Sequence, residues 1–277
     1  MIRFSIITVC LNAGEDLIST VTDTLRQTYE NFEIVVKDGF YTDRSVAKHP
    51  ADDRIRLVRK KDTGIYDAMN QAVQEATGDY LIFMNAGDWF YDNRVLADIA
   101  SIIESTRAPL YYGSCFDRQT GQVRAYPKHF TRMSCYRTMI CHQATVYRAD
   151  IFAEHPYDLS YRILADREML WYLVCGKGVS PVYIDRVIAN YQGAGESASE
   201  KHKARNQADQ QRLMDTYMPK WEQRKYALLM ALTFQKARVK LSQSPKYSGA
   251  YYRTIRRLYA WKEALSGKKN RKKENNP

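Results

Sequence analysis

Three stretches decide the fold: SIITVCLN at residues 5–12, EIVVKDG at 33–39, and KDTGIYDAMNQAVQEATGDYLIFMNAGD at 61–88. The first two are short runs rich in β-branched residues, which is typical of buried strands. The third begins with a helical pattern, in which Ile65, Met69, Ala72 and Val73 share one face, and ends in an apolar strand at 80–84. This alternation of strand and helix predicts an α/β fold with a parallel, doubly wound sheet.

Polar residues follow each of the predicted strands. Asn12 follows the first strand, which itself contains Thr8, and Asp38, Asp62 and Asp88 follow the next three. In open α/β sheets the ligand binds beyond the carboxyl ends of the strands. We therefore expect these side chains to gather around one site.

Two strand ends carry residue types suited to a nucleotide ligand. In Asn85-Ala86-Gly87-Asp88, a carboxylate on a tight loop suits a hard divalent cation, although Asp88 could equally cap a following helix. Asp38-Gly39 could accept a hydrogen bond from a base or a ribose, but such a pair is also common in plain turns.

Two further candidates lie in the second half of the chain. Asp166, in Leu164-Ala165-Asp166-Arg167-Glu168, could act as a general base at a helix start or serve only as an N-cap. His142 and Gln143 precede a strand, and the histidine could contact phosphate or a metal, or be structural.

Charge is unevenly distributed along the 277 residues. Residues 201–277 hold 20 lysine and arginine residues against 5 aspartate and glutamate residues, within a chain of net charge +11. This asymmetry predicts a body at 1–198 and a basic helical extension at 199–277, with an acidic partner such as phospholipid or nucleic acid.

The sequence also bears on location. No secretory leader is recognisable, and no apolar stretch approaches the roughly 20 residues that span a bilayer. The five cysteines show no CxxC spacing, which disfavours a disulfide framework or a zinc site. We expect a cytoplasmic protein, peripheral on the inner face of the plasma membrane.

Taken in order, SIITVCLN, EIVVKDGFYTDRS and KDTGIYDAMNQAVQEATGDYLIFMNAGD resemble the family 2 glycosyltransferases of the GT-A fold. The resemblance is specific over about residues 3–92. It continues more thinly through CHQATVYR, LADREMLWYL and NYQGAGES to about residue 197, and its nearest branch builds bacterial exopolysaccharide, capsule and O-antigen. Family members often carry more acids where Asn85 stands, and arginine where Met69 stands.

The resemblance implies an inverting hexosyltransferase that moves a sugar from a nucleotide-sugar, most often a UDP-sugar, to a hydroxyl of a saccharide acceptor. It implies a donor site made by Thr8, Val9, Asp38, Asp62, Asn85 and Ala86. It also implies that Asp88 binds Mn²⁺ or Mg²⁺, that Asp166 is the catalytic base, and that His142 and Gln143 lie on the acceptor or diphosphate side.

The expected acceptor is linked to a polyprenyl lipid, and this would suit a basic tail on an anionic membrane. Two other interpretations compete. A nucleotidyltransferase of similar fold would carry a basic residue in the loop after the first strand, which 9–15 lacks. A nucleic-acid-binding protein would leave the acids at 38–88 unexplained, so no nucleic-acid partner is expected.

Overall fold

The computed structural model describes residues 1–39, 50–192 and 203–232, together with 244, 247, 249–251, 253–255 and 257. The chain forms two compact units, Met1–Pro219 and Lys220–Pro277. Helix α7 (Lys203–Tyr217) falls within the first unit. The division predicted at residues 198 and 199 stays a prediction.

The first half of unit 1 is a parallel sheet with crossover helices. Its elements are β1 (Phe4–Cys10), α1 (Glu15–Leu25), β2 (Phe32–Asp38), β3 (Ile55–Arg59), α2 (Ile65–Gln74) and β4 (Tyr80–Phe83). The strand order is β3-β2-β1-β4, and each neighbouring pair is parallel. The carboxyl ends of these strands therefore lie along one edge, as the sequence predicts.

The second half extends the same sheet with antiparallel as well as parallel pairs. It comprises β5 (Trp89–Phe90), α3 (Val95–Thr106), β6 (Leu110–Asp117), β7 (Gln122–Arg124), α4 (Arg132–Arg137), η2 (His142–Ala144), β8 (Thr145–Arg148), α5 (Asp150–Glu154), α6 (Ala165–Trp171), η3 (Tyr172–Gly176) and β9 (Val182–Tyr191). Strand β8 runs antiparallel between β4 and β6, and β6 pairs in parallel with β9. The mixed sheet continues as β8-β6-β9-β5, and β7 pairs antiparallel with β6 at its side.

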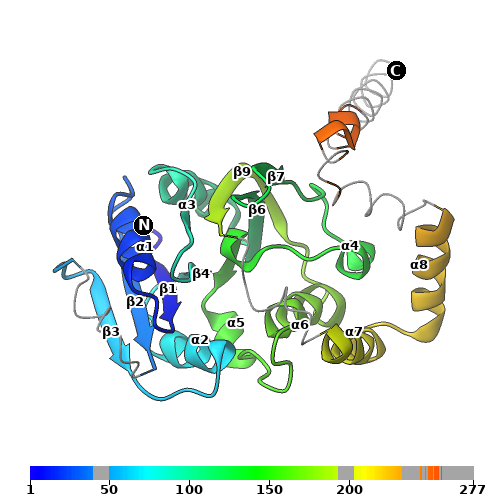
Figure 1. Ribbon diagram of the computed structural model, residues 1–277, viewed down its shortest axis with the longest axis horizontal. Helices are drawn as coiled ribbons and strands as arrows, with labels where there is room; N and C mark the ends of the chain where they lie inside the picture. Colours follow the sequence, from blue (N-terminus) through cyan, green and yellow to red (C-terminus); the bar gives the residue numbers. More distant parts are fainter. Residues whose placement is uncertain are drawn as a thin grey trace. The chain divides into compact units, whose positions relative to one another are not determined.

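Helices cover both faces of the sheet (Figure 1). The main core holds Leu17 and Val21 of α1 and Ile99 of α3 against residues such as Ile6 and Ile82 of the central strands. Because side chains alternate along a strand, the residues between these point to the opposite face. There α2 packs on β1 and β2.

The face of α2 differs from the predicted one. Tyr66, Ala68, Met69 and Ala72 are buried, whereas Ile65 is 42% exposed. Of the four residues predicted to share one face, Met69 and Ala72 are buried, but Ile65 lies at the edge of that face in contact with solvent. The inward position belongs to Tyr66, whose buried hydroxyl lies 2.9 Å from both Ile163 O and Asp166 Oδ1 and shares its one proton between these acceptors.

Unit 2 begins with α8 (Lys220–Leu232). Further along, positions 249–251, 253–255 and 257 are helical. Of the predicted basic extension, residues 199–202, 233–243 and 258–277 lie outside the described residues, so the basic extension stays a prediction. No described helix is long and apolar enough to cross a membrane.

Candidate active site

The loop after β4 is fixed by backbone contacts on several sides. Ala86 N–H donates to Val9 O, and Gly87 N–H donates to Thr20 Oγ1 at 2.9 Å. Arg118 donates from Nη2 to Gly87 O at 2.7 Å. Gly87 has φ 94°, a region that favours glycine, and a Cβ there would meet a neighbouring side chain. The loop is therefore held in one conformation.

Asp88 closes this loop with a buried carboxylate. Its Oδ2 accepts from Gln143 Nε2 at 2.6 Å, and its Oδ1 accepts from Gln192 N–H at 2.9 Å. Burial raises the pKa of Asp88, and these two hydrogen bonds partly oppose the rise. Strand β5 follows directly and α3 starts only at Val95, so Asp88 is not a helix cap.

A continuous polar chain runs from this loop to α6. Asn85 Nδ2 lies 3.0 Å from His142 Nε2, and His142 Nδ1 lies 3.2 Å from Asp166 Oδ2. Tyr66 OH donates to Asp166 Oδ1 at 2.9 Å. When Asn85 donates to Nε2, a neutral imidazole carries its proton on Nδ1 and donates it to Asp166. The structure thus brings together three of the residues that the sequence singles out.

Asp166 is placed to accept a proton. Helix α6 begins at Ala165 after Leu164, so Asp166 lies in the first turn and is not the N-cap. Its Oδ1 accepts from both Tyr66 OH and Arg167 N–H, at 2.9 and 2.8 Å, whereas Oδ2 accepts only from His142 among the described residues. The side chain is 15% exposed. Oδ2 therefore keeps a lone pair for an incoming hydroxyl.

Tyr66 is the functional candidate that sequence reasoning missed. Burial raises its pKa well above the usual value, and Asp166 adds to the rise, so Tyr66 stays a hydrogen-bond donor. Its ring lies 5.1 Å from that of Tyr157. Asn70, one turn further along α2, donates to Tyr157 O and accepts from Tyr157 N–H. Nothing in the local pattern at Tyr66 signals these contacts.

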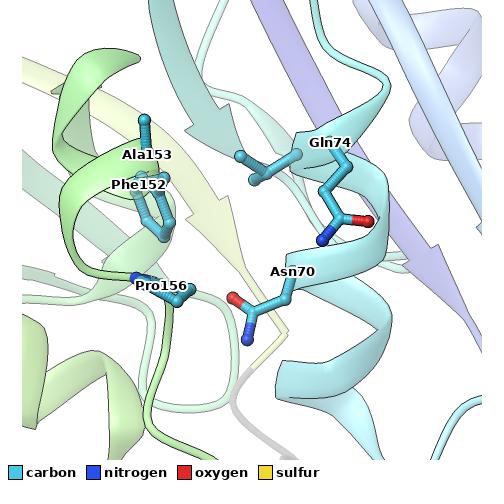
Figure 2. Close-up of a pocket in the computed structure, with 6 residues that line it drawn as sticks. Asn70, Gln74, Phe152, Ala153 and Pro156 are labelled. Atoms are coloured by element: carbon cyan, nitrogen blue, oxygen red, sulfur yellow. The ribbon is translucent and has the colours of Figure 1, made fainter.

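The same part of the fold contains a pocket of about 270 Å³ between α2 and α5. Figure 2 shows Asn70 and Gln74 of α2 facing Phe152, Ala153 and Pro156. None of the predicted site residues lines it. It is linked to the residues described above through Asn70, which lines the pocket and bonds the backbone of Tyr157.

Asp38 and Asp62 sit in ion pairs at the ends of β2 and β3. Lys37 Nζ lies 2.8 Å from Asp62 Oδ2, with both side chains almost fully buried, and Lys37 also donates to Lys60 O. Arg59 Nε lies 3.1 Å from Asp38 Oδ2. Asp38 thus lies beside the end of β1, in register with Cys10, whereas Asp62 is held at β2 by Lys37. Their predicted contacts with the base and ribose stay predictions.

Thr8 and Val9 are buried in β1. Thr8 Oγ1 has no hydrogen-bond partner among the residues that the structure describes. A buried hydroxyl without a partner is uncommon in a folded protein. The expectation that Thr8 and Val9 line the nucleotide pocket stays a prediction.

Asn85 and Asp88 of the β4 loop carry the oxygen atoms that could hold a hard divalent cation, and their role as ligands stays a prediction. Asn85 Oδ1 is buried without a described partner, and the Asp88 carboxylate makes no ion pair with a described residue. Across the described ranges, no three His, Cys, Asp or Glu side chains gather as a metal cluster. The protein offers few ligands, so most of the coordination would fall to the oxygens of a bound diphosphate and to water.

Comparison with known proteins identifies the class of protein to which this fold belongs. The family model of glycosyl transferase family 2 matches residues 5–161, and the chain belongs to that family. The PGL/p-HBAD biosynthesis glycosyltransferase of Mycobacterium bovis is 34% identical over 199 residues, which cover 69% of this chain and 77% of that protein. An uncharacterized glycosyltransferase of Mycobacterium tuberculosis is 30% identical over 202 residues, covering 69% and 75%.

Solved structures share the fold. TarS 1–349 of S. aureus, in complex with UDP, matches with a TM-score of 0.55 and 18% identity, covering 69% of this chain and 60% of that one. The mannosyltransferase PcManGT of Pyrobaculum calidifontis, in complex with GDP-Man and Mn²⁺, matches with a TM-score of 0.56 and 15% identity, covering 74% and 61%. The chain thus spans about three fifths of these proteins. The GT-A fold is confirmed.

Proposed function

We propose that this protein is an inverting glycosyltransferase that moves a hexose from a nucleoside-diphosphate sugar to a hydroxyl of a saccharide acceptor. The observation that carries the proposal is the polar chain from Asn85 through His142 to Asp166. One end of this chain is the β4 loop, which we expect to face the donor diphosphate. The other end is Asp166, a partly exposed carboxylate that has a free lone pair.

Asp166 acts as the general base. As the acceptor oxygen attacks the anomeric carbon, its proton passes to Asp166 Oδ2, and the bond from that carbon to the phosphate oxygen breaks. Tyr66 and Arg167 N–H fix the other carboxylate oxygen. His142 stabilises the orientation of the whole group. The attack occurs in a single displacement, which inverts the anomeric configuration.

The leaving diphosphate departs beside the β4 loop. When bound, Mn²⁺ or Mg²⁺ supplies a Lewis acid that neutralises charge on the departing oxygens, and Asp88 and Asn85 Oδ1 are the residues that would hold it. Arg118, which donates to Gly87 O and stacks on the Trp89 ring at 3.8 Å, adds a fixed positive charge to this loop.

The nucleotide and the acceptor are proposed from relatives. TarS structures hold UDP and UDP-GlcNAc, and PcManGT holds GDP-Man, so a uridine or guanosine diphosphate sugar is supported, and we place UDP first. Thr8, Val9, Asp38, Asp62, Asn85 and Ala86 form the proposed donor site. The acceptor is a lipid-linked saccharide in cell-surface glycan synthesis, used at the inner face of the plasma membrane. The mycobacterial relative is named for PGL/p-HBAD biosynthesis, a second acceptor class to test.

A transfer assay tests the proposal. The protein is incubated with UDP- and GDP-sugars, Mn²⁺ and a panel of soluble saccharide acceptors, and the product linkage is determined by NMR. We expect a product of inverted anomeric configuration, and a loss of about 10²- to 10⁴-fold in kcat for Asp166→Asn. A retained configuration would exclude the single displacement, and an unchanged rate for Asp166→Asn would exclude Asp166 as the base.

A further inference from the structure

Helix α8 exposes three large apolar side chains on one side. Trp221, Leu228 and Leu232 are 65%, 62% and 66% exposed. At 100° per residue, the spacings i, i+7 and i+11 place these three side chains within an arc of about 40°. An apolar stripe normally faces a core. In α8 this stripe is exposed to solvent, on the side opposite to the buried residues of the helix.

The covered side of α8 holds two further large side chains, Tyr226 and Met230, together with the carboxylate of Glu222. Glu222, Tyr226 and Met230 follow one another at four-residue spacing and are all buried. The carboxylate of Glu222 accepts a hydrogen bond from Tyr226 OH at 2.7 Å. Burial of these three side chains leaves Trp221, Leu228 and Leu232 on the exposed side of the helix.

Two basic residues accompany the stripe. Arg224 and Lys225 are exposed, lie at i+3 and i+4 from Trp221, and make no ion pair with a described residue. Long basic side chains can lay their stems along an apolar surface and keep their charges at its polar edge. Tryptophan favours the boundary between water and hydrocarbon.

We propose that the Trp221 face of α8, made of Trp221, Arg224, Lys225, Leu228 and Leu232, docks on the surface of an anionic lipid bilayer. Charge complementarity favours this occupant, because residues 201–277 are strongly basic. Two copies of the face would bring their own Arg224 and Lys225 together. Three apolar side chains are also far fewer than a stable protein interface of about 1,200–2,000 Å² requires.

The inference rests on the proposed function in one respect: a lipid-linked acceptor explains why this enzyme would need the membrane. It also specifies which part of the basic C-terminal region inserts apolar side chains. The lipid headgroups would contact Arg224 and Lys225, and Trp221, Leu228 and Leu232 would enter the boundary with the acyl chains.

Vesicle co-sedimentation of the full chain tests the docking face. We expect binding to phosphatidylglycerol-rich vesicles and weak binding to pure phosphatidylcholine. Leu228→Glu/Leu232→Glu should lower the partition coefficient by at least about tenfold, and Arg224→Gln/Lys225→Gln by about fivefold per charge on anionic vesicles only. Leu159→Glu, which changes a leucine that is 49% exposed in unit 1, is the matched control and should bind like the wild type.

Two further readings make the result decisive. Brominated lipids should quench the wild-type tryptophan emission more than that of Trp221→Phe. Transfer to a soluble acceptor should be the same in the wild type and in all α8 variants. Absence of transfer by the wild type would count against the proposed function, whereas the vesicle results would still decide the docking face. Unchanged vesicle binding by Leu228→Glu/Leu232→Glu, or a wild-type dimer that this variant dissociates, would overturn the inference.

Discussion

Replacing His142 perturbs the polar chain at its centre. His142→Ala removes the donor to Asp166 Oδ2 and the contact with Asn85, which measure 3.2 and 3.0 Å. A hydrogen bond to a charged group contributes about 1.5–3 kcal/mol, which corresponds to a loss of about tenfold to a hundredfold in kcat if the bond matters in the transition state. We expect a loss in that range, with little change in the KM for the donor.

His142→Asn is the matched control. An asparagine Nδ2 occupies nearly the position of the histidine Nδ1, so this variant keeps the donor to Asp166 and loses only the contact with Asn85. We expect it to retain most of the wild-type kcat. Both variants are assayed by release of the nucleoside diphosphate at saturating substrates, and thermal unfolding confirms that each is folded.

A double-mutant cycle completes the test. If His142 acts through Asp166, then adding His142→Ala to Asp166→Asn should cost no further activity. Fully additive losses would show that His142 acts elsewhere. Equal slowing by His142→Asn and His142→Ala would refute the role assigned to Nδ1.

Three further predictions follow from the described contacts. Tyr66→Phe keeps the ring against Tyr157 but removes the donor to Asp166, so steady-state kinetics should show kcat lowered by about tenfold. Lys37→Met leaves the buried Asp62 without its partner and should cost about 3–5 kcal/mol in chemical denaturation, part of which Lys37→Met/Asp62→Asn restores. Burial raises the pKa of Asp23 to about 6, so native Asp23 binds its proton more tightly than the unfolded chain and stability should fall as pH rises from about 4 to 6. Melting curves should show that fall in the wild type and a smaller one in Asp23→Asn, which would be the more stable protein at pH 7; an equal or steeper fall would contradict this.

Short-range patterns in the sequence predict the first half of the fold well. Runs of β-branched residues mark β1 and β2, and because the carboxyl ends of parallel strands share an edge, Asp38 and the loop at Asn85 could be placed near each other. The helical period of α2 was also recognisable. The burial of Tyr66 on this helix could not be recognised from the sequence, because it depends on a partner about 100 residues away.

The second half of the site depends on long-range packing that no local pattern encodes. Gln143 reaches Asp88 because β8 pairs antiparallel with β4, which brings η2 beside the β4 loop. The sequence named His142 and Asp166 separately and left a structural role open for each. Only the fold shows that the two side chains touch, and that Lys37 is the partner of Asp62.

Calorimetric titration with UDP and with GDP, each with and without Mn²⁺, tests the central claim most directly. The account predicts that one of them binds in a metal-dependent manner, that Asp88→Asn largely abolishes this binding, and that Asp150→Asn, which changes an exposed carboxylate on α5, does not. If neither nucleotide binds to the folded protein with or without the metal, the assignment of a nucleotide-sugar site to the carboxyl edge of β1–β4 is contradicted.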